Sequence, residues 1–254
     1  MTVFVDVVGN GPNLTLLHGW GLNGAAWLGI RDELARHHTL HIIDLPGHGR
    51  SHGAPVTTMD ALVDAVARAM PAQTHLLGWS LGGHAALALA HRYPARVDKL
   101  VSVCATPRFV AGDDWPHGKK PDVLADFARR LSTNYLATIR NFLALQALHQ
   151  PGMREVIRKL YDAVDAHGAP SITGLAATLD ILRASDIRAQ VPAIATPVLV
   201  IQGDHDALTN VAAGQWLADH LPDSTYCLIE HAAHAPFLSH RDIFLDHLFA
   251  FLAR

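Results

Sequence analysis

The sequence has few cysteines and little net charge. Its 254 residues include only two cysteines, Cys104 and Cys227, and both lie in apolar runs typical of strands. This disfavours a disulfide framework, and we expect two buried, reduced thiols instead. The net charge of −3 at pH 7 gives no overall attraction to nucleic acid or to an anionic membrane, so neither is expected as a partner.

Segments for export or membrane insertion are also lacking. The first residues show no basic stretch followed by a long apolar one, so no secretory signal is expected. No apolar run approaches ~20 residues, the length that crosses a bilayer as a helix. We therefore expect a cytoplasmic protein. Because 50% of its residues are hydrophobic, the chain is able to bury a sizeable core.

Metal-binding spacings are missing as well, although the chain holds 18 histidines. The histidines are scattered, and neither an H-E-x-x-H motif nor a clustered Cys/His pattern occurs. The sequence therefore predicts no metal site and no cofactor.

The most informative stretch is an apolar run that leads into Gly-Trp-Ser-Leu-Gly at residues 78–82 and then into an alanine-rich, helix-favouring run. A G-x-S-x-G nucleophile elbow requires this order of strand, sharp turn and helix. In such a turn Ser80 would stand exposed at the helix N-terminus, where backbone N–H groups favour developing negative charge. The alternative is a glycine-rich turn whose serine is only a helix cap, and the motif alone does not decide between the two.

Strand and helix patterns alternate around this unit. Strands are predicted at 3–8, 14–17, 39–43, 97–104, 197–202 and 225–230, with the elbow unit at 74–93 and helices at 25–37, 59–70, 211–220 and 241–252. This alternation predicts an α/β fold, with a mostly parallel central sheet covered by helices on both faces. Asp44, at a strand end before Pro-Gly, is interpreted as a residue that orders its loop.

Residues 108–184 break the alternation. They carry helical patterns at 121–149, 151–166 and 171–183 without a convincing strand. Such an insertion predicts a helical cap over the C-terminal ends of the strands, with residues 1–107 and 185–254 forming the core. The cap holds ten Lys and Arg against eight Asp and Glu, a net charge of +2.

Ser80 would need a general base, and the base would need an acid that orients it. Two acids follow a later strand, Asp204 and Asp206, and two histidines follow the last strand, His231 and His234. The order serine, acid, histidine is the order of these groups in α/β hydrolases. The residues themselves leave both choices open.

The order of elements and three motifs, at residues 18–21, 44–51 and 78–83, resemble the α/β-hydrolase superfamily. Along nearly its whole length the chain is similar to one family within it, the pimeloyl-acyl-carrier-protein methyl ester esterases of biotin synthesis. The narrower likeness depends on the segments at 17–23, 120–125, 142–146 and 232–237 in addition to the elbow.

The resemblance implies a nucleophile at Ser80, an acid at Asp206 and a base at His234. It also implies that the backbone N–H groups of Trp20 and Leu81 hold the oxyanion. The acyl channel would be lined by a cap segment made up of Phe142, Leu143, Ala144, Leu145 and Gln146, although the apolar members of this segment could equally be helix-packing residues.

The substrate that the resemblance implies is a pimeloyl methyl ester carried on acyl-carrier protein. Arg154 and Arg158 match the family's docking positions, and Arg140 is a further candidate. Two other basic positions are occupied by Ala137 and Asn141. A general short-chain carboxylesterase, lactonase or perhydrolase is the first alternative, and a binding protein on a hydrolase scaffold is the second. We expect a monomer.

Overall fold

The computed structural model describes residues 3–51, 53, 56–150, 152–167 and 171–254. Within these residues, strands form one sheet in the order β1-β3-β2-β4-β5-β6-β7. Their bounds are β1 Val5–Val8, β2 Asn13–Leu17, β3 Thr39–Ile43, β4 Thr74–Trp79, β5 Val97–Val103, β6 Val198–Gly203 and β7 Ser224–Ile229. The edge strand β1 pairs with β3 in the antiparallel sense, and the other pairs are parallel. This confirms the predicted mostly parallel sheet.

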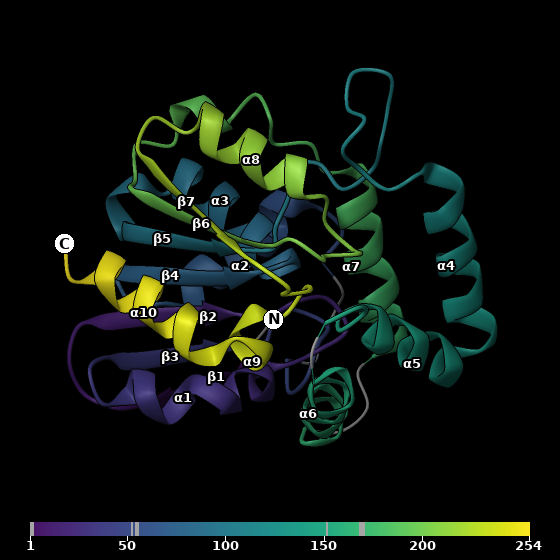
Figure 1. Ribbon diagram of the computed structural model, residues 1–254, viewed down its shortest axis with the longest axis horizontal. Coiled ribbons are helices and arrows are strands. Elements are labelled where there is room, and N and C mark those ends of the chain that lie inside the picture. Colours follow the sequence, from purple (N-terminus) through teal and green to yellow (C-terminus); the bar gives the residue numbers. More distant parts are fainter. Residues whose placement is uncertain (1–2, 52, 54–55, 151, 168–170) are drawn as a thin grey trace.

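Helices cover both faces of the sheet (Figure 1). Helices α1 (Leu28–Ala35) and α10 (Arg241–Leu252) contact each other on one face, and α2 (Met59–Ala69) and α3 (Leu81–Arg92) pack together on the other. Helix α8 (Val211–His220) lies against β6 and β7. Because neither face is open to water, inner strands such as β6 are buried along their whole length and are mostly apolar.

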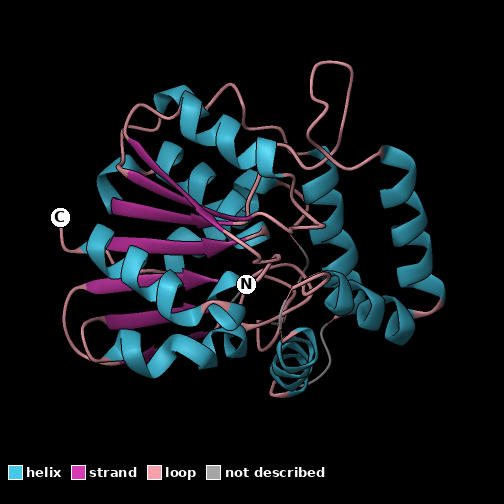
Figure 2. Ribbon diagram, in the orientation of Figure 1, coloured by secondary structure: helices cyan, strands magenta, loops and turns pink. Residues whose placement is uncertain are grey.

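The cap consists of helices α4 (Pro121–Thr133), α5 (Tyr135–Leu145), α6 (Met153–Asp165) and α7 (Ile172–Ala184). They lie on the side toward which the parallel strands point (Figure 2). The helical segment predicted at 121–149 is divided into two helices, because Asn134 takes non-helical angles (φ −146°, ψ 69°) and separates α4 from α5. Asparagine leaves a helix readily, since its side chain competes for backbone hydrogen bonds. Two further differences are small: residues 24–27 form a 3₁₀ helix before α1, and a short helix α9 (Pro236–Ser239) precedes α10.

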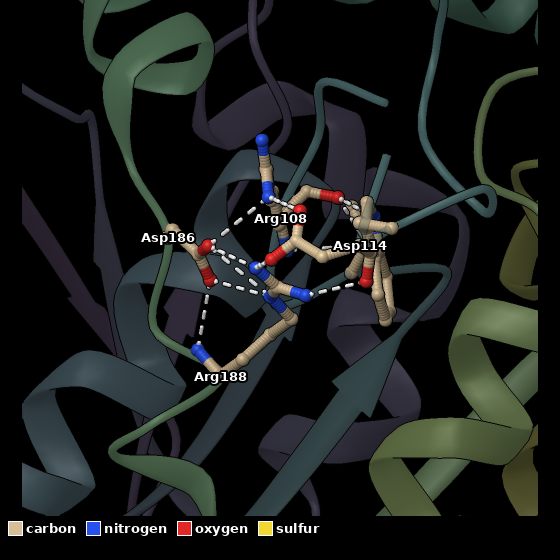
Figure 3. Close-up of polar contacts among 6 residues, drawn as sticks. Arg108, Asp114, Asp186 and Arg188 are labelled. Carbon is tan, nitrogen blue, oxygen red and sulfur yellow. Dashed lines mark hydrogen bonds and ion pairs between the residues drawn. The ribbon is translucent and has the colours of Figure 1, made fainter. Parts of the chain in front are cut away.

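An ion-pair network joins the two ends of the cap insertion (Figure 3). Arg108 and Asp186 face each other in an isolated antiparallel bridge. Arg188 Nη2 lies 2.7 Å from Asp186 Oδ2 and 2.6 Å from Asp114 Oδ2, and Arg108 Nη1 lies 2.8 Å from Asp114 Oδ1. Two guanidinium groups thus share two carboxylates, and such networks hold better than isolated surface pairs. The two ends of the cap insertion therefore lie side by side on the core.

Asp44 orders the loop after β3, as its position predicted. Its carboxylate accepts hydrogen bonds from the Gly24 N–H (2.7 Å), the Arg50 N–H (2.9 Å) and Arg50 Nε (2.7 Å). Among the described residues, no helix combines the length and the apolar character that crossing a membrane requires.

Candidate active site

Ser80 occupies a strained turn between β4 and α3. Its backbone angles, φ 56° and ψ −116°, lie in a region that residues other than glycine rarely adopt. Two hydrogen bonds hold the turn: the Ser80 N–H donates to the carbonyl of Val103 (2.9 Å), and the His84 N–H donates to the carbonyl of Ser80 (2.9 Å). This strain is the backbone signature of a nucleophile elbow.

The glycines on either side of Ser80 are required by close backbone packing. A Cβ atom on Gly78 would overlap the carbonyl oxygen of Gly82 and lie 2.7 Å from the Cα of Gly83. A Cβ atom on Gly82 would lie 2.5 Å from the carbonyl carbon of Leu17 in β2. The G-x-S-x-G spacing therefore allows β4, α3 and β2 to meet around the serine.

The loops after β6 and β7 bring Asp206 and His234 together. His234 Nδ1 lies 2.8 Å from Asp206 Oδ2, and both side chains are buried, with exposed fractions of 1% and 0%. Asp204 and His231, the alternatives that the sequence left open, lie outside this contact and belong to a separate cluster with His205. Two acids and two histidines allow four acid–histidine pairs. The pair that is in contact in the structure is the one that the resemblance implied.

Asp206 is held as an ionised acceptor. Burial alone raises the pKa of its carboxyl, but His234 and the hydrogen bonds from Thr209 outweigh burial and lower the pKa below its usual range. Oδ1 accepts from the N–H groups of Leu208 (2.8 Å) and Thr209 (2.9 Å), and Oδ2 accepts from Thr209 Oγ1 (2.6 Å) and Gln202 Nε2 (3.0 Å). The carboxylate can only accept from His234 Nδ1, so that nitrogen carries a proton. Nε2 of His234 is buried and has no hydrogen-bond partner among the described atoms, which leaves its lone pair for a substrate or nucleophile proton.

The loop after β2 brings a backbone donor close to the serine. A Cβ atom on Gly19 would lie 3.3 Å from the Cβ of Ser80. His18 Nε2 accepts from the Leu45 N–H (2.9 Å), so its Nδ1 is protonated and donates to the carbonyl of Gly19 (2.8 Å). In a planar trans peptide the Gly19 carbonyl and the Trp20 N–H point in opposite directions, so His18 fixes the direction of that N–H. Leu81 begins α3, so its N–H has no acceptor within the helix.

Ser80 lines a cavity of about 260 Å³ between the core and the cap. Trp20 lies beside it in the wall, and its indole Nε1 donates to the carbonyl of Leu175 in α7 (3.0 Å). The other lining residues are mostly apolar and come from the cap and the acid loop: Phe109, Lys119, Val123, Leu124, Phe127, Phe142, Leu145, Leu179, Leu182, Ala207 and Leu208. The cavity suits an acyl chain better than a charged group.

The structure places only part of the segment predicted as the acyl channel at the cavity. Phe142 and Leu145 line the cavity, whereas Leu143 is fully buried in the core, and Ala144 and Gln146 are not among the lining residues. Because residues three apart share a helix face, one face of α5 meets the cavity and the other meets the protein interior. Gln146 contributes differently, since its backbone carbonyl accepts from the N–H of His234 (3.1 Å).

Three contributors to the site were missed from the sequence. Lys119 lines the cavity, and its ammonium donates to the carbonyl of Ala207, next to Asp206. Thr209 hydrogen-bonds Asp206, and its place three residues later in the same loop was the available signal. Cys104 has its sulfur within 4.8 Å of ligand atoms of Asp206 and His234. Both cysteines are free and buried as predicted, and burial raises the pKa of Cys104 well above its usual range, so it stays a thiol.

The proposed docking arginines lie on the cap surface. Arg154 and Arg158 are exposed on α6, and Arg140 is exposed on α5. Arg158 Nη1 lies 3.2 Å from Asp162 Oδ2 in the same helix. The carbonyl of Arg140 accepts from the hydroxyl of Tyr161 on α6 (3.4 Å), so the two helices that carry these arginines are in contact.

Comparisons with known proteins agree with this geometry. The family model described as alpha/beta hydrolase fold matches residues 12–241. The chain is 44% identical over 242 residues to the pimeloyl-acyl-carrier-protein methyl ester esterase of Cronobacter sakazakii, covering 95% of this chain and 93% of the relative. It is 36% identical over 245 residues to the protein of the same name from Nitrosomonas europaea, covering 96% and 97% of the two chains.

Solved structures show the same fold at lower identity. An esterase from Exiguobacterium antarcticum superposes with a TM-score of 0.88 at 21% identity, covering 99% of this chain and 96% of the other. An enol-lactonase from Burkholderia xenovorans reaches a TM-score of 0.85 at 22% identity, with the same coverage. The chain therefore belongs to the α/β hydrolase fold family and, within it, to the family of the pimeloyl-acyl-carrier-protein methyl ester esterases.

Proposed function

We propose that this protein is a serine carboxylesterase that hydrolyses the methyl ester of pimeloyl-acyl-carrier protein in biotin synthesis. The observation that carries the proposal is the buried Asp206–His234 pair with a free Nε2, in a fold that places Ser80 on a strained elbow beside an apolar cavity. The full-length relatives at about 40% identity supply the substrate, since their names state it.

The reaction has two acyl-transfer steps. Ser80 gives its hydroxyl proton to Nε2 of His234 and attacks the ester carbonyl, and the N–H groups of Trp20 and Leu81 stabilise the oxyanion. Methanol leaves with the proton from His234. Water then gives a proton to His234 and attacks the acyl-enzyme, and His234 returns this proton to the Ser80 oxygen as the free acid leaves. Throughout, Asp206 holds the tautomer of His234 and stabilises its protonated form.

The cavity and the cap surface support the two halves of the substrate. The aromatic and aliphatic walls suit the methylene chain of a pimeloyl group. Arg140, Arg154 and Arg158 are exposed on α5 and α6, where they are able to contact an acidic carrier protein. The carrier protein stays outside and only its acyl arm enters.

The test compares Ser80→Ala and Asp206→Asn with the unmodified protein on a p-nitrophenyl ester and on the carrier-bound methyl ester. We expect Ser80→Ala to lower kcat/KM by roughly 10³–10⁶ on both substrates, and Asp206→Asn to lower kcat by about 10⁴. Asp204→Asn is the matched control and should cost far less activity. Unchanged turnover in a folded Ser80→Ala protein would refute the esterase mechanism. If the unmodified protein turned over only the p-nitrophenyl ester, the esterase mechanism would stand and the proposed carrier-bound substrate would be refuted.

A further inference from the structure

A second cluster of ligand-type side chains lies beside the acid and base loops. Asp204 and His205 follow β6, and His231 follows β7. One ligand atom from each of these side chains lies within 4.8 Å of the others. The imidazole rings of His205 and His231 have centroids 5.6 Å apart and are inclined by 61°. None of the three residues has a role in the proposed ester chemistry.

The side chains are available for a ligand. Asp204 Oδ1 is buried and finds no hydrogen-bond partner among the described atoms, which is a costly state for a carboxylate oxygen. His205 Nδ1 lies 3.0 Å from the carbonyl of His149 and must donate to it, so the lone pair of His205 is on Nε2. A backbone carbonyl that orients the other nitrogen in this way is the usual support for a metal-binding histidine.

We propose that Asp204, His205 and His231 bind one divalent transition-metal ion of the Zn²⁺ class. Two imidazoles and a carboxylate suit Zn²⁺, Ni²⁺ or Cu²⁺, whereas Mg²⁺ and Ca²⁺ take oxygen ligands. Zn²⁺ bonds of about 2.0–2.1 Å in a tetrahedral site place ligand atoms roughly 3.4 Å apart. The three side chains must therefore close in on the ion, and His231 is exposed and free to do so. Water completes the coordination.

The surrounding backbone is already arranged for this closure. The His205 N–H donates to the carbonyl of Ala232 (2.9 Å), and a Cβ atom on Gly203 would overlap the carbonyl oxygens of Ala232 and Ala233. The loops after β6 and β7 thus touch before any ion binds. A bound ion would cross-link the two loops that carry Asp206 and His234. Because Asp204 and His231 are far apart in the sequence, their spacing matches no metal-binding motif. For this reason no metal site was predicted from the sequence.

The test uses the full chain after treatment with EDTA and dialysis, titrated with ZnCl₂ in a calorimeter and followed by thermal unfolding. We expect one Zn²⁺ per chain and a rise in Tm of about 5 °C at a hundredfold excess over Kd, because the site forms only in the folded state. MgCl₂ should give neither effect.

The variants His205→Gln and His231→Asn should each weaken Zn²⁺ binding at least tenfold and, at the same Zn²⁺ concentration, reduce the rise in Tm to about half or less. Asparagine tolerates the positive φ of His231 (61°), so the backbone there is kept. His247→Asn removes an exposed histidine of α10 and should bind Zn²⁺ like the unmodified protein. Absence of binding to the unmodified chain would overturn the proposal. So would binding to both cluster variants as tight as to the unmodified chain, because the ion would then sit elsewhere, for example on Cys104, Asp206 and His234.

Discussion

At the scale of single residues, the hydrogen bonds of His18 act most directly on the groups around Ser80. His18 accepts from the Leu45 N–H and donates to the carbonyl of Gly19, and burial lowers its pKa, so the ring stays neutral with a defined tautomer. The Trp20 N–H is thereby aimed before substrate arrives. A preorganised donor acts on the oxyanion of the transition state more than on the ground state.

We therefore expect His18→Ala to lower kcat about 10- to 100-fold, less than the ~10²–10³ typical of losing an oxyanion donor outright. KM for a small ester should change within about twofold, because the cavity walls remain. Steady-state kinetics on a p-nitrophenyl ester measure both constants, and His18→Asn, whose amide can still donate, should recover part of kcat. A loss confined to KM would show that His18 shapes the binding site and does not position the donor.

The local sequence singled out Ser80 as the candidate nucleophile, but by itself it left open which acid and which histidine lie beside it. The elbow is local, so its glycines and serine are readable from adjacent residues. Asp204 and Asp206 stand two residues apart on one loop, and only the fold decides which of them faces His234. Lys119 could not have been found from neighbouring residues, since the Ala207 carbonyl that it contacts is 88 residues away in the sequence.

At the scale of elements, helix α7 rests directly on the loop after β3. A Cβ atom on Gly174 in α7 would lie 2.6 Å from the Cα of Gly47, and one on Gly47 would lie 2.7 Å from the Cα of Gly174. The same helix supplies Leu179 and Leu182 to the cavity wall and the carbonyl of Leu175 to the Trp20 indole. The depth of this contact therefore sets the position of one cavity wall.

Gly174→Ala should push α7 away from the loop. We expect a destabilisation of about 1–3 kcal/mol, as for other overpacked contacts, and a larger rise in KM for long acyl esters than for acetate esters. The matched control is Gly29→Ala in α1, an exposed glycine whose added Cβ would meet only the flexible end of Leu238 at 3.2 Å. Thermal unfolding and a series of p-nitrophenyl esters measure the two effects. Equal KM changes for short and long esters would contradict the assignment of α7 to the acyl wall.

The exposed arginines of α6 give a second prediction at this scale. Arg154→Glu combined with Arg158→Glu should raise KM for the carrier-bound methyl ester at least ~10-fold, about 1.4 kcal/mol, and the effect should weaken as salt screens the charges. Turnover of a free p-nitrophenyl ester should stay within about twofold. Arg36→Glu combined with Arg68→Glu makes the same change of charge on the surface outside the cap. This control should leave KM and turnover of both substrates unchanged. An equal rise in KM for this control would mean that only net charge matters.

Elements were easier to predict than the breaks between them. The helices at 211–220 and 241–252 and the strand at 39–43 have the predicted bounds, because their periodic apolar residues face a continuous core. The break at Asn134 depends on a single residue that also occurs inside helices, so the local pattern there is that of one long helical segment. Short bridges such as Arg108 with Asp186 are non-local and leave no periodic signal.

At the scale of the whole molecule, buried histidines link stability to pH. His18, His48 and His84 are fully or nearly fully buried, and burial lowers the pKa of each, that of His48 to about 3. The ring of His18 packs against that of His48 and lowers its pKa further, whereas the charge of Asp44 opposes the shift. In the unfolded chain these rings take up protons near pH 6.5, while the folded state excludes them. The free energy of unfolding is therefore highest above pH 6.5 and falls as the pH drops toward 3.

We expect Tm to fall between pH 7 and pH 5, with a loss of about 1.4 kcal/mol per pH unit for each histidine that stays neutral in the folded state. Carboxylates such as Asp44 and Asp186, whose pKa values are lowered in the fold, add to the loss only at more acid pH. His48→Asn should keep a side-chain donor for the carbonyl of Pro46. It should also reduce the number of protons taken up on unfolding by about one, which makes the free energy of unfolding less dependent on pH. Thermal unfolding at several pH values measures this. A slope unchanged by His48→Asn would show that other groups control the acid transition.

The meeting of the two cap ends at Arg108 and Asp186 has a consequence for how such proteins diversify. Because the insertion leaves and re-enters the core at a single clasp, its helices can be lengthened, shortened or exchanged without moving the strands on either side. The free-energy cost of closing a longer insertion grows only slowly with its length. Changes in the cap helices that keep the carbonyl of Gln146 against the His234 N–H can therefore alter the cavity wall while the strand ends that carry Ser80, Asp206 and His234 stay in place.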